Sequence, residues 1–361
     1  MYRRIVIKVG TKVLSTKENQ LDVDVLGHLV EEIVAIKKKG IEVILVTSGA
    51  MGAGRGLITL KNIERAAEKQ ILASVGQVKL MSIYSECFAK HNKLCAQVLA
   101  TKEDFRDKTH YFNMRTCFEN LLHSGVVPVV NENDVVATTE LLFTDNDELA
   151  GLVASQLNAD AVIILTSVEG FLTGDPQDPN SAVIPEIDFN NIHALQKHIS
   201  PDKTAFGRGG MLTKFNIAKK LTLQGITVFF ANGKRKNVLV DLASGKSIGT
   251  KFIPRGKSSS IKRRIAYSEG LTKGTVQINK CAVDLLLSQT KIMSLLPVGV
   301  TNVEGDFNKG DIVEILGDER QKIGFGIAQY DTKRAKECMG KKNGKAIIHY
   351  DYMFINPPNI F

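Results

Sequence analysis

The sequence predicts an α/β protein with a mainly parallel sheet covered by helices, followed by a small, mostly β domain. Apolar runs such as VVPVV and AVIIL show no polar alternation, which is typical of strands buried on both faces. These runs alternate with helix-like segments over roughly the first 235 residues, which indicates repeated βα units. After about Ser268 the segments shorten and Gly, Asp and Asn turns separate them, which indicates the β domain.

The elements of the α/β part follow from periodicity. Arg4–Val9 is a short run of Ile and Val and predicts the first strand. A helix is expected over 23–39, because its apolar residues recur at the helical period and Gly40 follows it. Further helices are expected near 63–89 and 111–123, and an amphipathic helix after GRGGMLTK. Further strands are expected at Val43–Thr47, Cys95–Leu99, Val126–Val130, Ala161–Thr166 and Thr227–Phe230.

The last part of the chain has its own pattern. The segments GDFNKGDIVEILG, KIGFGIAQY and KAIIHYDYM predict strands, and a helix is expected near Lys333–Cys338. The stretch 251–264 carries six basic residues and no acidic one, which predicts an exposed linker or, less favoured, a phosphate-facing patch. We therefore expect domains at 1–255 and 271–361, joined by a basic linker at 256–270.

Composition excludes several classes of protein. The 361 residues contain no apolar run near the roughly 20 residues of a membrane helix. The N-terminal apolar segment is interrupted by Lys8 and Lys12, which favours a strand over a signal peptide and predicts a cytoplasmic location. The five cysteines form no CxxC pair, so neither a zinc site nor a disulfide framework is expected. The net charge of +9 is compatible with binding nucleic acid or ATP.

Ligands of open parallel sheets bind at the carboxyl ends of the strands. The loops expected there are KVGTKVL, TSGAMGAGRG, NENDVVATTELLFTDNDELAG and TSVEGFLTGDP, and GRGGMLTK precedes a helix. None has the spacing of a dinucleotide fingerprint or a Walker loop. Together they supply glycines for close backbone approach, two lysines and three carboxylates. This combination suits phosphoryl transfer, which needs positioning and charge stabilisation, and the charged residues are Lys8, Lys214, Asp134, Asp145 and Asp147.

These loops resemble, in the same order, those of the amino acid kinase family and of its glutamate 5-kinases in particular. The matching pieces are VIKVGTKVL, VTSGAMGAGR, NENDVVAT, DND, LTSVEGFLTGDP and GRGGMLTK, spread over about residues 1–255. The segment LLPVGVTNVEGDFNKGDIVEI resembles a PUA domain, an RNA-binding β fold. The resemblance implies an amino acid kinase-like three-layer αβα sandwich with a PUA-like C-terminal domain.

The resemblance also implies a reaction and partners. ATP, with Mg²⁺, would phosphorylate the γ-carboxylate of L-glutamate to L-glutamyl 5-phosphate, the first step of proline biosynthesis. Proline would inhibit this activity, and the chain would form a homo-oligomer, either a dimer or a tetramer. The product could be handed to glutamyl phosphate reductase. RNA binding by the PUA-like domain stays open, and so does the identity of any protein ligand to Mg²⁺, because the phosphates can hold the ion.

Site residues follow from the resemblance, position by position. Lys8 and Lys214 would stabilise the charge in transit, and Asp147 would hold both lysines. The glutamate site would consist of Ser48, Gly49, Ala50, Asp134 and Asn146. The ATP site would consist of Lys8, Gly10, Thr11, Thr166, Ser167, Gly207, Arg208, Gly209, Gly210, Met211 and Lys214. A carboxylate of this type titrates at about 4.3, so glutamate needs no general base to attack.

Two other functions compete with this reading. An acetylglutamate or aspartate kinase would share the core, but acetylglutamate kinases typically have a double glycine where this chain has KVGT. An RNA-binding regulatory protein would explain the positive charge and the basic stretch. Against it, the aromatic residues of the last domain are scattered and are expected in its core: Phe307, Phe325, Tyr330, Tyr350 and Tyr352.

Two positions depart from the pattern of the family and make the expected nucleotide pocket more positive. Ser167 stands where an aspartate is common, and Arg208 stands where a threonine is common. Arg208 either pairs with a phosphate or points to solvent. The KM for ATP of Arg208→Thr separates the two, because it stays unchanged if the side chain faces solvent.

Overall fold

The computed structural model describes residues 2–18, 20–61, 63–136, 145–174, 178, 180–189, 210–255, 265, 272–288, 293–342 and 344–356. The chain separates into two compact units, 1–257 and 258–361. The domain boundaries expected from the sequence stay a prediction, because most of the basic linker lies outside the described residues. None of the described helices is long and apolar enough to cross a membrane.

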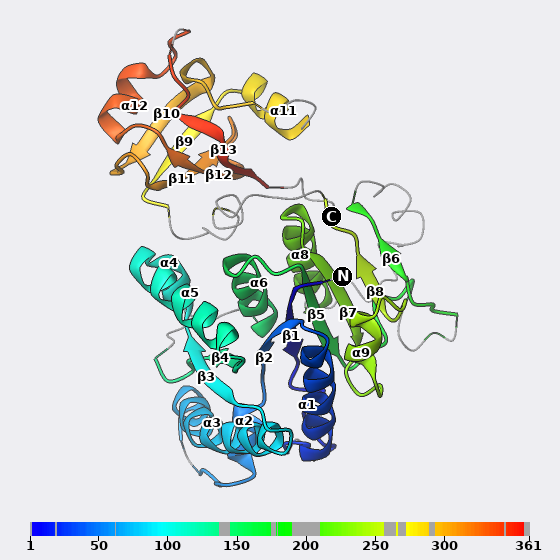
Figure 1. Cartoon of the computed structure of the whole chain (residues 1–361). Coiled ribbons are helices and arrows are strands. Elements are labelled where there is room, and N and C mark those ends of the chain that lie inside the picture. The colour runs from blue at the N-terminus through cyan, green and yellow to red at the C-terminus, as the bar shows by residue number, and fades with distance from the viewer. Residues whose placement is uncertain are drawn as a thin grey trace. The chain divides into compact units, whose positions relative to one another are not determined.

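The first unit is built on a sheet of eight described strands in the order β3-β4-β2-β1-β5-β7-β8-β6 (Figure 1). Neighbouring strands from β3 to β7 are parallel, whereas β8 runs antiparallel to β7. The sheet is therefore mainly parallel, as predicted. The strands are β1 (Arg4–Val9), β2 (Glu42–Val46), β3 (Cys95–Ala100), β4 (Val127–Glu132), β5 (Ala161–Thr166), β6 (Glu186–Ile187), β7 (Thr227–Asn232) and β8 (Thr250–Phe252).

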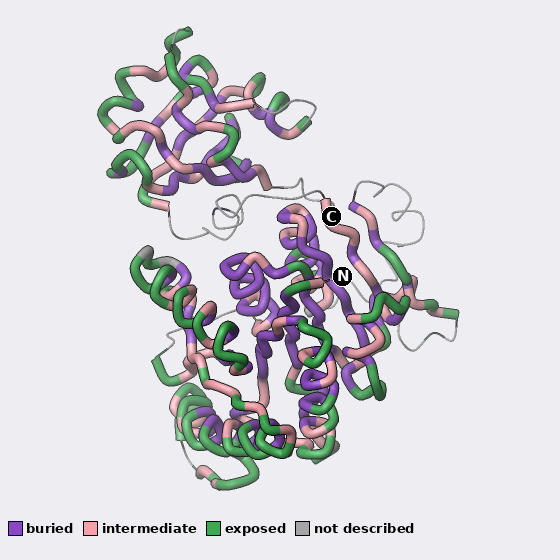
Figure 2. Tube along the Cα trace, in the orientation of Figure 1, coloured by how far each residue is buried: buried purple, intermediate pink, exposed green. Residues whose placement is uncertain are grey.

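Helices cover both faces of this sheet. The residues Ile5, Ile7 and Val9 of β1 share a core with α1, α3 and α9. The alternate residues of the same strand face α6, which also packs against α8, because successive side chains of a strand point to opposite faces. Figure 2 shows the central strands buried between the two layers. The helices are α1 (Val23–Lys38), α2 (Ala50–Arg55), α3 (Arg65–Ala89), α4 (Lys102–Arg106), α5 (Lys108–His123), α6 (Asn146–Gln156), α8 (Gly210–Leu223) and α9 (Val238–Ala243).

The sequence predicted the long strands and helices closely but missed several helices, namely α2, α4, α6, α9 and α11 (Lys280–Ser288). The strands β1 and β5 have the predicted bounds. Helix α2 lies in a segment interpreted as a glycine loop, and its glycines are tolerated because it packs tightly against α3. Helix α6 was not predicted, because eight consecutive residues from Leu149 to Gln156 are buried and leave no polar face to reveal a helical period.

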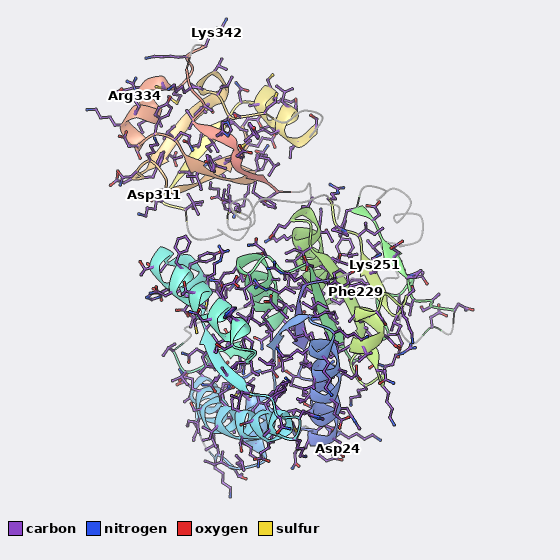
Figure 3. All side chains as sticks on the ribbon, in the orientation of Figure 1. Asp24, Phe229, Lys251, Asp311, Arg334 and Lys342 are labelled. Atoms are coloured by element: carbon purple, nitrogen blue, oxygen red, sulfur yellow. The ribbon has the colours of Figure 1, made fainter. Side chains whose placement is uncertain are left out.

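The second unit is a five-stranded sheet in the order β10-β9-β11-β12-β13 with its own core. Phe307 and Phe325 belong to the buried residues, as predicted, whereas Tyr350 is exposed. Polar side chains such as Asp24 and Lys342 project from the surfaces of the two units (Figure 3). The elements are β9 (Gly274–Ile278), α11 (Lys280–Ser288), the 3-10 helix Pro297–Gly299, β10 (Val300–Gly305), β11 (Ile312–Leu316), β12 (Lys322–Ala328), α12 (Thr332–Cys338) and β13 (Ile348–Ile355).

Two glycines allow α2 and α3 to approach each other closely. A Cβ added at Gly76 would lie 1.8 Å from the carbonyl oxygen of Ala50, and one added at Gly54 would lie 2.1 Å from that of Leu72. Backbone atoms cannot move aside as a flexible side chain can. The two glycines therefore fix where α2 begins, directly after the loop that follows β2.

We expect Gly76→Ala to destabilise the protein by about 1–3 kcal/mol, because the added methyl overpacks the contact between the helices. Gly27→Ala is the control, since nothing lies within 4 Å of a Cβ at Gly27 in α1. That change should stabilise by about 0.5–1 kcal/mol through helix propensity. Urea unfolding followed by circular dichroism measures both, and equal effects of the two substitutions would contradict the close approach.

Candidate functional site

Two lysines and two aspartates meet near the carboxyl end of β1. The Nζ atom of Lys8 lies 3.2 Å from Oδ1 of Asp145 and 2.6 Å from Oδ1 of Asp147. The Nζ atom of Lys214 lies 3.1 Å from Oδ2 of Asp145 and 2.5 Å from Oδ2 of Asp147. Each carboxylate thus divides its two oxygens between two ammonium groups. We call these four residues the Lys–Asp cluster.

Local sequence explains how each member of the cluster is presented. Lys8 lies on the face of β1 opposite Ile7 and Val9, and therefore faces α6. Asp145 is the N-cap residue of α6 and Asp147 lies in its first turn, where the helix dipole stabilises negative charge. Lys214 follows the start of α8 by about one turn. One strand and two helices are therefore needed to assemble the cluster.

The charged groups of the Lys–Asp cluster are buried or half-buried, so each needs a partner of opposite charge. The Asp147 side chain is 0% exposed and that of Lys8 is 4% exposed. Burial alone would raise the pKa of Asp145, but the charges and hydrogen bonds of Lys8 and Lys214 outweigh it and lower the pKa to about 2. Burial alone would lower the pKa of Lys214, but the two aspartates raise it above its ordinary value. At neutral pH Lys214 therefore keeps its positive charge in a poorly hydrated place.

A cavity of about 1180 Å³ opens beside the cluster and includes Asp145 in its wall. All five residues expected at the glutamate site line this one cavity, and they come from three different segments: Ser48, Gly49, Ala50, Asp134 and Asn146. Burial raises the pKa of Asp134, and the charge of Lys69 partly offsets this. The cavity therefore combines carboxylates, basic side chains, hydroxyl and amide groups, and the start of α2.

Asn146 is held in place by three acceptors around its amide nitrogen, which shares its two hydrogens among them. Its Nδ2 donates to the backbone oxygen of Thr47 at 2.7 Å, to Oγ of Ser48 at 3.0 Å and to Oδ1 of Asn131 at 3.0 Å. Asn131 is 3% exposed and also lines the cavity. The sequence reasoning missed Asn131, although it is the first residue of the NEND motif and follows directly after a buried apolar run.

The residues expected at the nucleotide are only partly described. Thr11 lines the cavity, whereas Gly10, Thr166, Ser167 and Met211 are not among its lining residues. The backbone N–H of Gly10 donates to the oxygen of Leu165 at 3.3 Å, so the loop after β1 lies beside the end of β5. Gly210 begins α8. Gly207, Arg208 and Gly209 lie outside the described residues.

The described residues do not form a metal centre. They contain no group of three or more His, Cys, Asp or Glu side chains placed to hold a metal ion. Both carboxylates of the Lys–Asp cluster contact lysines instead. Mg²⁺ usually binds one or two carboxylates together with substrate phosphates, so ATP would supply much of its ligand set here.

Comparison with known proteins identifies the family. The model of the amino acid kinase family matches residues 3–232, and that of the PUA domain matches residues 274–350. A protein of Chlorobaculum tepidum named glutamate 5-kinase is 50% identical over 358 residues, which are 99% of this chain and 98% of that protein. The chain belongs to the glutamate 5-kinases of the amino acid kinase family. The resemblance found in the sequence and the fold class predicted from it are confirmed.

More distant proteins agree on the fold. A Bacteroides thetaiotaomicron protein, also named glutamate 5-kinase, is 46% identical over 98% of this chain and 99% of its own. A solved carbamate kinase of Giardia lamblia with AMP-PNP superimposes with a TM-score of 0.52 at 20% identity, covering 70% of this chain and 99% of that one. The kinase fold is therefore shared, while the PUA domain is an addition to it.

We expect Asp145→Asn to reduce stability at neutral pH, and the difference from the wild type to shrink on acidification. The folded-state pKa of Asp145 is lowered to about 2, so its stabilising contribution is present above its ordinary pKa of about 3.9 and is lost as the pH falls towards 2. Urea unfolding of both proteins between pH 6 and pH 2.5 measures the difference.

Glu186→Gln is the control for loss of a negative charge, because Glu186 pairs with Lys251 on the surface. Its effect should be small, since exposed pairs stabilise by about 0–1 kcal/mol. A difference between wild type and Asp145→Asn that does not change with pH would show that the carboxylate charge is not what stabilises the fold there.

Proposed function

We propose that the protein transfers the γ-phosphoryl group of ATP to the γ-carboxylate of L-glutamate, as the first step of proline biosynthesis. The observation that carries the proposal is the Lys–Asp cluster beside a cavity lined by Asp134 and Asn146. The 50% identity to a glutamate 5-kinase over nearly the whole chain supports the choice of substrate. The products are L-glutamyl 5-phosphate and ADP.

The reaction needs positioning and charge stabilisation more than proton transfer. An oxygen of the substrate carboxylate forms a bond to the γ-phosphorus, and the bond from that phosphorus to the bridging oxygen of ADP breaks, leaving its electron pair on ADP. No proton moves, which fits a site with lysines and no histidine among its described residues. Lys8 and Lys214 offset the negative charge that two anions bring together.

Asp147 has a different role in this mechanism. It contacts both lysines and is completely buried, so it fixes the distance between the two ammonium groups. Two unpaired buried ammonium groups would repel each other and favour the neutral form. We infer that Asp147 holds both lysines aimed at the transferred group, and Asp145 assists from the wall of the cavity.

The cavity suits an amino acid with a free ammonium group. The carboxylate of Asp134 complements an ammonium group, and the hydroxyl of Ser48 with the backbone near Gly49 and Ala50 complements a carboxylate. Acetylation would remove the positive charge that Asp134 recognises. This favours glutamate over N-acetylglutamate and disfavours an acetylglutamate kinase, the first alternative from the sequence.

The nucleotide site is proposed from the loops around the cluster. Gly10, Thr11, Thr166 and Ser167 would contact ATP from the ends of β1 and β5, and the segment 207–214 would wrap its phosphates. A helix N-terminus such as that of α8 favours anions. Inhibition by proline, a homo-oligomeric state, transfer of the product to a reductase, RNA binding and a cytoplasmic location stay predictions from the sequence.

A hydroxylamine trap tests the function, because an acyl phosphate converts to a coloured hydroxamate. The protein with ATP and Mg²⁺ is given L-glutamate, N-acetylglutamate, aspartate or no acceptor, and one further sample contains glutamate with millimolar proline. We expect colour with glutamate alone and less colour with proline. Colour with another acceptor would assign a sibling activity, no colour with any would contradict the kinase proposal, and undiminished colour with proline would contradict inhibition.

We expect Lys214→Ala to lower kcat by about 10²–10³ while the KM for glutamate changes far less, because the lost charge acts mainly in the transition state. Steady-state kinetics with both substrates measures the separation. Lys79→Ala on the exposed side of α3 controls for the loss of a lysine. A change in KM alone would contradict a transition-state role for Lys214.

A further inference from the structure

Four side-chain amides form a chain of hydrogen bonds that ends at the cavity. Asn146 Nδ2 donates to Asn131 Oδ1 at 3.0 Å, and Asn131 Nδ2 donates to Gln77 Oε1 at 2.9 Å. Gln77 Nε2 donates to Gln97 Oε1 at 3.0 Å. The four residues come from α6, β4, α3 and β3, and we call them the amide relay.

Two backbone groups fix the direction of the relay. Asn146 Nδ2 lies 2.7 Å from the carbonyl oxygen of Thr47, which can only accept a hydrogen bond. Asn131 Oδ1 lies 2.9 Å from the backbone nitrogen of Glu132, which can only donate. Neither asparagine can exchange its oxygen and nitrogen without losing one of these bonds. The donor sense therefore runs from Asn146 towards Gln97.

This direction decides which atom of Asn146 is left for a ligand. Its Nδ2 is occupied by Thr47, Ser48 and Asn131, and no described residue donates to its Oδ1. Because Asn146 lines the cavity, its oxygen is the atom available to a ligand there. An oxygen that only accepts requires a donor on the ligand, and the Asp134 carboxylate in the same cavity requires positive charge.

The two ends of the relay differ in exposure. Gln77 is 9% exposed and Asn131 is 3% exposed, so loss of a partner leaves a buried polar group without a hydrogen bond. Gln97 is exposed and can reorient in contact with water. Gln77 does not line the cavity. The hydrogen bonds of the relay connect Gln77 to the cavity through Asn131 and Asn146.

We propose that Gln77 is a positioning residue for the amino acid substrate: through Asn131 it holds Asn146 with its amide oxygen towards the cavity, and so selects a ligand with a free ammonium group. The inference rests on the proposed function, since it assigns Gln77 a role in binding glutamate. Among the described residues, the side-chain hydrogen bonds of Gln77 run to Asn131 and Gln97, not to the Lys–Asp cluster or to the loops expected at the nucleotide. We therefore expect its substitution to act mainly on the amino acid.

The test compares three substitutions of similar volume. Gln77→Met removes the acceptor for Asn131 and should raise the KM for glutamate about three- to tenfold, with kcat and the KM for ATP within about twofold. Gln77→Glu keeps an oxygen acceptor, and the exposed Gln97 can turn to donate to it, so most of the affinity should return. Gln224→Met is the control. Gln224 is also buried and accepts a hydrogen bond from Ser155 at 2.6 Å, but it does not line the cavity.

Hydroxamate formation at varied glutamate and ATP gives the constants, and thermal unfolding reports stability. Gln224→Met should lower the melting temperature without changing the KM for glutamate. An unchanged KM for Gln77→Met, or an equal loss for Gln77→Met and Gln77→Glu, overturns the positioning role alone. A wild-type protein that forms no hydroxamate from glutamate overturns the proposed function, and the positioning role with it.

Discussion

The carboxylate of Asp147 has no contact with solvent, and it lies between two ammonium groups that arrive from different parts of the fold. A buried charge without a partner costs several kcal/mol, so such a group is retained only where the surrounding elements hold its partners in place. This constraint ties the start of α6 to β1 on one side and to α8 on the other. The positions of the cavity and of the nucleotide loops both depend on that arrangement.

The site would bind the phosphates of ATP and the amino acid through different interactions. Phosphate groups would be bound by the positive charges of two lysines. The two aspartates offset the repulsion between the ammonium groups of these lysines. The amino acid would be bound by the carboxylate of Asp134 together with oriented neutral groups, because the amide relay and the backbone of Thr47 fix the direction of Asn146. Charge acts over a distance and binds anions of many shapes, whereas a directed amide discriminates donors from acceptors. The directed amide thus adds to the charge of Asp134 in the choice of substrate.

Prediction from the sequence succeeded where a local run of apolar residues indicates a buried strand. The unbroken apolar runs marked β1, β4 and β5, and glycines with charged residues marked the loops after them. It failed for α6, because a helix buried on every side has no polar face, although α6 carries Asp147 and Asn146. It also missed Asn131 and Gln77, since their importance lies in hydrogen bonds to each other and not in any spacing along the chain.

The sequence by itself determined which chemical groups the site can contain and on which face of β1 Lys8 lies, because alternation along a strand is a local property. It also placed the remaining candidates in loops at one edge of a parallel sheet. Only the tertiary structure decided that Lys8 and Lys214 both reach Asp145, across separations of 137 and 69 residues. Ion pairs and hydrogen bonds depend on distances of about 3 Å, and such distances are set by how helices and strands pack rather than by their order.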